Sequence, residues 1–86
     1  MHIQGSLLIP EIFVRNEIPS GLKNRINQTF TTTSNFVANS TEVWCGGLKR
    51  SLGLDNDYVE SGDNQIVFNF IIYETDNILV SYKKQA

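Results

Sequence analysis

The pattern of apolar and polar positions favours strands in the first half of the chain. Residues 3–15 (IQGSLLIPEIFVR) suit extended structure through Ile, Val and Phe. Pro10 removes a backbone donor in their middle, so we expect an edge strand, a bulge or two short strands on either side of Pro10. Residues 31–45 are rich in Thr and aromatic residues, which also suits strands, with a turn at the polar residues 38–41.

A helix is predicted over residues 20–30. Ser20 can cap it, and Leu22, Ile26 and Phe30 recur every four residues, which places them on one apolar stripe. The polar residues between them fall on other faces of such a helix. We therefore expect the stripe to pack against a sheet as part of the core, with a docking surface as the less favoured alternative.

A β-hairpin is predicted over about 65–84. Alternating apolar residues mark one face of each strand, namely Ile66, Phe68, Phe70 and Ile72 in the first and Ile78, Val80 and Tyr82 in the second. The two faces coincide when Ile72 pairs with Val80, and that register leaves the three-residue loop 75–77.

Together these elements predict a small α+β fold with a single domain over residues 1–86. It would hold an antiparallel sheet of four to five strands, one packed helix and the C-terminal hairpin. The second face of that hairpin is also apolar, through Val67, Ile71 and Tyr73. This face is either covered by the rest of the domain or forms the contact of a homo-oligomer.

Composition narrows the classes of function. A net charge of −2 over 86 residues gives no general basic field that would attract nucleic acid. No run approaches the roughly 18 apolar residues of a membrane span, and the opening MHIQGSLLIP lacks the pattern of a signal peptide. The single cysteine cannot form an internal disulfide, so we expect a cytoplasmic protein.

The stretch 51–64 (SLGLDNDYVESGDN) is the first candidate site. It holds four acidic residues and no basic one, namely Asp55, Asp57, Glu60 and Asp63. An EF-hand loop starting at Asp55 is excluded, because Val59 and Ile66 would occupy ligand positions. Three interpretations stay open: a solvated connector, a docking surface for a basic protein partner with Tyr58 as its apolar anchor, and a weak calcium site from Asp55, Asp57 and Glu60.

The second candidate site is VWCGGLKRS, residues 43–51. Leu48 and Leu52 lie four residues apart, which predicts a short helix or turn that ends near Gly53. Two glycines between a strand and a helix start can expose backbone N–H groups to an anion. The residues that would hold a phosphate or nucleotide are Gly46, Gly47, Lys49, Arg50 and Ser51. The spacing matches neither the P-loop nor the dinucleotide-binding pattern, and glycine pairs often only turn the chain.

The chain offers few groups for catalysis. His2 is the single histidine, and one histidine with one cysteine cannot make a zinc site. Cys45 follows Trp44 on a predicted strand, so we expect a buried apolar group rather than a nucleophile. We therefore predict no catalytic residue, no metal and no cofactor, and expect a protein that is not an enzyme.

These observations predict a non-catalytic binding protein that associates with a protein partner, in the manner of small inhibitors, antitoxins or immunity proteins. The acidic stretch would steer a basic partner toward it. The alternative is an oligomeric small-ligand binder that holds a phosphate or nucleotide at the glycine turn. A structural subunit that forms a homo-oligomer without any ligand is the third hypothesis.

Overall fold

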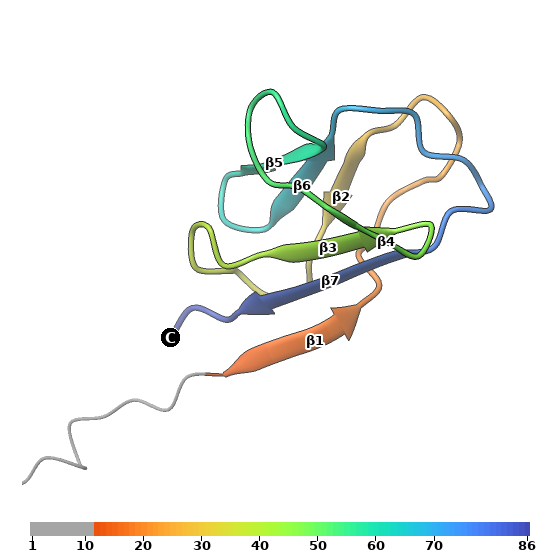
Figure 1. Cartoon of the computed structure of the whole chain (residues 1–86). Coiled ribbons are helices and arrows are strands. Elements are labelled where there is room, and N and C mark those ends of the chain that lie inside the picture. Colours follow the sequence, from red (N-terminus) through yellow and green to blue (C-terminus); the bar gives the residue numbers. More distant parts are fainter. Residues whose placement is uncertain (1–11) are drawn as a thin grey trace, which may run out of the picture.

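The structure is a computed structural model that describes residues 12–86, and within that range it is built from strands without a helix (Figure 1). The strands are β1 Phe13–Glu17, β2 Thr29–Thr31, β3 Glu42–Cys45, β4 Leu48–Arg50, β5 Tyr58–Ser61, β6 Gln65–Phe68 and β7 Ile78–Lys83. The predicted α+β class is therefore wrong, and so is the single sheet of four to five strands.

The seven strands form two antiparallel sheets that enclose one core. The first sheet has the order β1-β7-β3-β4 and the second has the order β2-β6-β5. The sheets are also joined at both sides. Ser20, beyond the end of β1, pairs with Thr31 of β2, and Leu52, beyond the end of β4, pairs with Tyr58 of β5. These two bridges cover part of the outer edges of β2 and β5, where unpaired backbone groups would otherwise be open to other chains.

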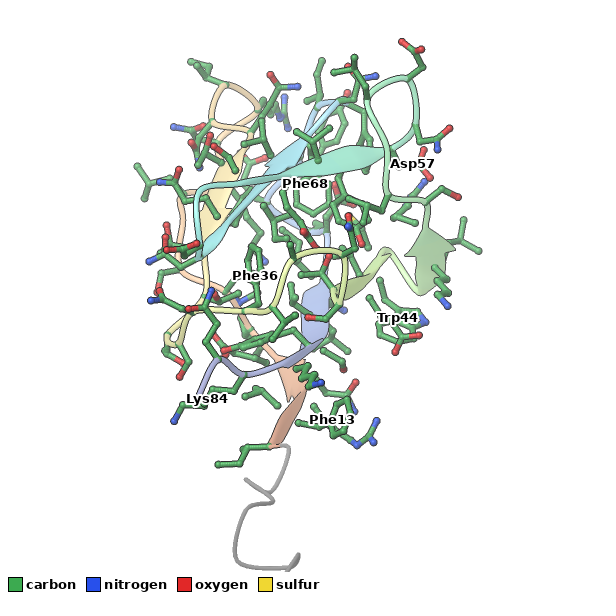
Figure 2. All side chains as sticks on the ribbon, turned by 90° about the vertical axis from the view of Figure 1, so that its left-hand side faces the viewer. Phe13, Phe36, Trp44, Asp57, Phe68 and Lys84 are labelled. Carbon is green, nitrogen blue, oxygen red and sulfur yellow. The ribbon has the colours of Figure 1, made fainter. Side chains whose placement is uncertain are left out.

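Apolar side chains from both sheets fill the space between them. The buried core consists of Phe30, Phe36, Val43, Cys45, Tyr58, Ile66, Phe68, Ile72, Ile78, Val80 and Tyr82. Figure 2 shows Phe36 and Phe68 in the interior, whereas Phe13 and Trp44 lie on the outside. The rings of Phe30 and Phe68 meet edge to face with centroids 5.7 Å apart, the geometry that aromatic pairs prefer.

The predicted helix over residues 20–30 is wrong, because asparagine side chains and a strand pairing satisfy the backbone there. Asn24 Oδ1 accepts the N–H groups of Ile26 and Asn27 at 3.0 and 2.8 Å, which closes a local turn. Arg25 has a φ of +71°, outside the helical region. Phe30 is buried, as expected for the stripe, but on strand β2 rather than on a helix.

The predicted C-terminal hairpin is also wrong, although most residues expected to face inward do so. β6 pairs with β2 and β5, while β7 pairs with β3 and β1, so the two strands lie in different sheets. Residues 69–77 connect the two sheets. Ile72 is buried within this connection, and Val80 pairs with Val43 instead of with Ile72. Alternation shows which side chains face a core, and two strands face the same core equally well from opposite sheets.

The segment directly after Gly47 is strand β4, not the predicted short helix or turn. Cys45 pairs with Leu48 across a turn in which Gly46 and Gly47 have φ values of +64° and +81°. Positive φ at both central residues defines a type I′ turn, which matches the twist of the flanking strands and favours glycine. A three-residue hairpin loop does occur, but at 62–64 between β5 and β6 rather than at the predicted 75–77.

The first predicted strand is confirmed in part. β1 is an edge strand, with an irregular register between Val14 and Glu17 where Asn16 has a φ of +54°. The rest of the predicted strand over 3–15, including Pro10, lies outside the described residues, as does His2. No helix that could span a membrane is found between residues 12 and 86.

Candidate functional site

The acidic stretch is spread over a loop, a strand and a turn. Asp55 and Asp57 lie in the loop before β5, Glu60 lies within β5, and Asp63 lies in the turn that follows it. Among residues 12–86, no three acidic, histidine or cysteine side chains come together in a way that could hold a metal. The fold therefore does not assemble Asp55, Asp57 and Glu60 as calcium ligands.

Two of these carboxylates hold the fold together. Asp57 Oδ2 accepts the backbone N–H of Ser51 at 2.9 Å and closes the loop between β4 and β5. Glu60 accepts the backbone N–H of Asn39 at 2.7 Å and the hydroxyl of Thr41 at 2.5 Å, so it fixes the turn before β3. Hydrogen bonds to a charged acceptor are roughly twice as strong as neutral ones, so both contacts serve stability.

Tyr58, expected as an exposed anchor for the partner, is instead part of the core. It is only 1% exposed, and its hydroxyl donates to the carbonyl oxygen of Thr41 at 3.0 Å. Burial raises the pKa of the Tyr58 phenol above its usual range, against the effect of the hydrogen bond with the Thr41 side chain at 3.1 Å. Tyr58 is therefore not available to a partner, which leaves Asp55 and Asp63 as the exposed acidic residues of the stretch.

The glycine turn closes a hairpin and does not open onto a helix. The N–H of Gly46 donates to the carbonyl oxygen of Asn77 at 3.0 Å, so this amide is used within the fold. Arg50 Nη2 donates to the carbonyl oxygen of Cys45 at 3.1 Å, and the guanidinium lies 4.7 Å from the centre of the Phe70 ring. The arginine is thus committed to contacts within the fold, and its Nε is buried without a partner. The five predicted phosphate-binding residues do not form one cradle.

An open groove of about 870 Å³ brings parts of the two candidate sites together. Its lining includes Lys49 and Ser51 of the glycine stretch and Tyr58 of the acidic stretch, with Glu42 beside them. The Lys49 ammonium lies 3.3 Å from Glu42 Oε2, with the two side chains 60% and 50% exposed, so their charges neutralise each other at the surface. Lys49 is also 5.9 Å from the centre of the Trp44 ring. The lining also includes Arg50 and Lys83, so the groove carries more basic than acidic residues, and the Lys49 ammonium is already paired with Glu42.

Cys45 is buried, as the sequence predicts. It is 1% exposed, and burial is the main reason why the pKa of its thiol is raised. The guanidinium of Arg50 acts in the opposite direction without cancelling that effect. A thiol with a raised pKa and almost no access is a poor nucleophile.

Exposed apolar side chains lie on two neighbouring segments, where the sequence predicts a mainly buried helix and, at Ile71 and Tyr73, a possible homo-oligomer contact. We call this surface the aliphatic end and define it as Ile18, Leu22, Ile26, Ile71 and Tyr73, which are 76%, 71%, 83%, 51% and 45% exposed. It accounts for five of the nine large hydrophobic residues that are exposed in the described part of the chain. They come from two segments, 18–27 and 71–77, that lie side by side at the right of Figure 1.

Specific contacts hold these two segments against each other. The N–H of Arg25 donates to the carbonyl oxygen of Ile72 at 3.0 Å, and Ile72 itself is buried in the core. Lys23 Nζ donates to the carbonyl oxygen of Asp76 at 2.9 Å. Arg25 Nε pairs with Glu74 Oε1 at 3.1 Å. The aliphatic end is therefore fixed by the fold and is not formed by loose loops.

The apolar spacing in this segment predicts burial of residues that the structure leaves exposed. The spacing of Leu22 and Ile26 fits a helix, and a helix would have buried both. The asparagines at 24 and 27 favour turns instead, and with a turn the same two residues face water. The predicted apolar hairpin face is exposed in part, at Ile71 and Tyr73, while Val67 is half-buried in β6.

Comparison with known proteins gave no match: no family model, no curated protein and no solved structure is significantly similar to this chain. The function is therefore argued from the geometry of the chain itself.

Proposed function

We propose that this chain is a non-catalytic protein-binding domain whose contact surface is the aliphatic end. The observation that supports the proposal is the exposure of Ile18, Leu22 and Ile26, at 76%, 71% and 83%, on a segment that the fold holds in place. Burying one such side chain fully contributes about 1.5–3 kcal/mol. Grouped apolar side chains on a small domain are typical of a protein interface.

The predicted class of function is retained, but the binding surface is the aliphatic end instead of the acidic stretch. Asp57 and Glu60 bind groups of the fold, and Tyr58 is buried, so the acidic stretch lacks the anchor that a docking surface needs. As part of the same proposal we place the protein in the cytoplasm, because its single buried thiol needs no oxidising compartment.

Affinity capture with three baits tests the proposal. The baits are the wild-type chain, the double variant Leu22→Asp/Ile26→Asp, and the control Leu54→Asp. Leu54 is 84% exposed, close to the 83% of Ile26, but lies in the loop between β4 and β5. We expect proteins that are retained by the wild-type chain and by Leu54→Asp to be lost from the double variant.

Circular dichroism and thermal unfolding first establish that all three baits are folded to the same extent. The substituted side chains are exposed, so their replacement removes little from the core. If the double variant retains the same proteins as the wild-type chain, the aliphatic end is not the contact surface.

A further inference from the structure

The charged residues of the two segments that form the aliphatic end sum to zero, since Lys23 and Arg25 stand with Glu74 and Asp76. Arg25 forms an ion pair with Glu74, whereas Lys23 donates to the backbone carbonyl oxygen of Asp76. Both side chains of the ion pair are about 60% exposed, so positive and negative groups lie side by side at the surface. We call these four residues the rim of the aliphatic end, and the rim has no net charge.

A rim of this kind discriminates between partners. A partner with a strong charge of either sign gains no long-range attraction from a neutral rim. A two-fold contact between copies requires a surface that is complementary to itself, because each residue meets the same surface on the other chain. A rim of one sign would repel its copy, whereas adjacent cations and anions can each face the opposite sign after a two-fold rotation.

The apolar centre satisfies the same requirement. Aliphatic side chains such as Ile18, Leu22 and Ile26 pack against their own copies without a special partner geometry. The Arg25 guanidinium also lies 5.2 Å from the centre of the Tyr73 ring, which places an aromatic and an arginine side by side at the rim. Tyr and Arg are the residue types that most often dominate the energy of protein contacts.

From this charge pattern we infer that the partner at the aliphatic end is a second copy of this chain, bound as a two-fold symmetric dimer. The inference rests on the proposed protein-binding function and names its partner. Association would also add stability to a domain of 86 residues, because small domains bury a smaller share of their surface.

Sedimentation equilibrium of the full chain tests the inference. The mass of the wild-type protein is expected to rise with concentration from 9.7 kDa toward twice that value. The variant Ile26→Asp is expected to stay at the mass of one chain over the same range, and the matched control Leu54→Asp is expected to behave as the wild-type chain does.

A charge exchange makes the test specific for self-association. Arg25→Glu leaves the end with Lys23 against three acidic groups, and Glu74→Arg leaves three basic groups against Asp76. Each variant should repel its own copy and weaken the dimer at least tenfold, whereas an equimolar mixture of the two should restore it. Loss of restoration at high salt would follow from screening of these exposed charges.

The wild-type chain remaining at the mass of one chain up to millimolar concentration would overturn the inference. Dimers in each charge variant alone, as strong as in the mixture, would overturn it as well. In either case the capture experiment decides separately on the proposed function: if proteins other than this chain are lost from Leu22→Asp/Ile26→Asp alone, the binding surface stands and its occupant is another protein.

Discussion

Tyr82 in the centre of the core donates its phenolic hydrogen to Glu17 Oε1 at 2.6 Å, and so ties the middle of the first sheet to its edge strand. Glu17 also accepts the N–H and the hydroxyl of Thr33, at 2.8 and 3.1 Å. One carboxylate thus fixes β1, β7 and the chain after β2. Because the aliphatic end begins just beyond β1, at Ile18, this contact helps to set its position.

Removal of the Tyr82 hydroxyl should therefore destabilise the whole domain. In Tyr82→Phe the carboxylate of Glu17 loses a donor and the N–H of Ser34 loses its acceptor. A hydrogen bond to a charged group contributes about 1.5–3 kcal/mol, and we expect the free energy of unfolding in urea to fall by about 2 kcal/mol. Tyr73→Phe, at a residue 45% exposed, is the control and should change it by less than about 0.5 kcal/mol. Equal losses in the two variants would contradict the role of Glu17.

The substitution Gly21→Ala distinguishes the strand fold from the helix that the sequence suggests. In a helix, alanine in place of glycine stabilises by about 1 kcal/mol. In the structure an added Cβ would lie against the Phe30 ring and 2.9 Å from the carbonyl oxygen of Thr29. We expect unfolding to become easier by about 1–3 kcal/mol, because the core must shift to accept the methyl group.

The neighbouring substitution Ser20→Ala is the control, because here a helix predicts a loss of stability and the strand fold predicts little change. A helix cap of serine would cost about 1 kcal/mol when replaced by alanine. In the structure Ser20 pairs with Thr31 through its backbone N–H and carbonyl, both at 2.8 Å, and alanine keeps these groups. If Gly21→Ala stabilises the domain and Ser20→Ala clearly lowers the free energy of unfolding, a helix over residues 20–30 would be correct and the strand fold wrong.

The glycine turn gives a test of backbone conformation alone. An added Cβ at Gly47 meets nothing within 4 Å, so Gly47→Ala costs only the strain of a φ of +81°. That strain amounts to about 1–2 kcal/mol. Gly47→Asn should cost clearly less, because asparagine tolerates the left-handed region. Urea unfolding of both variants checks the order, and an asparagine variant as unstable as the alanine variant would argue against the type I′ turn.

The Arg25–Glu74 ion pair predicts a dependence on pH. The pKa of Glu74 is lowered from its ordinary 4.5, first by a hydrogen bond from its own backbone and then by Arg25. Since the folded pKa is lowered, the contribution to stability is complete above pH 4.5 and is lost as the pH falls through the lower folded value. In an NMR titration, Arg25→Gln should move the pKa of Glu74 only part of the way back. A pKa that does not move at all would exclude the ion pair.

The sequence predicts burial better than pairing, and the C-terminal third shows why. Ile66, Phe68, Ile78, Val80 and Tyr82 are all buried, as their alternation indicates. Alternation is a local property and reports on one face of one strand. The partner of each strand depends on contacts between distant residues, so β6 and β7 could not be assigned to different sheets from their own pattern.

The candidate site could be predicted even less, for a related reason. Leu22 and Ile26 have helical spacing, but the Asn24 side chain accepts a backbone N–H and the Asn27 side chain donates to backbone carbonyls, and these bonds replace those of a helix. The acidic stretch predicts a docking surface because its four carboxylates are close together in the sequence. In the fold, Asp57 and Glu60 are turned toward backbone amides, and Tyr58 between them is turned toward the core.

Site-specific photo-crosslinking in the source cells is the most direct measurement of protein binding at the aliphatic end. A photoreactive phenylalanine derivative replaces Ile26 in one variant and the equally exposed Leu54 in another. We expect a covalent protein adduct from position 26, either with a second copy of this chain or with another protein, and no adduct from position 54. An adduct from position 54 with none from position 26 would contradict protein binding at the aliphatic end.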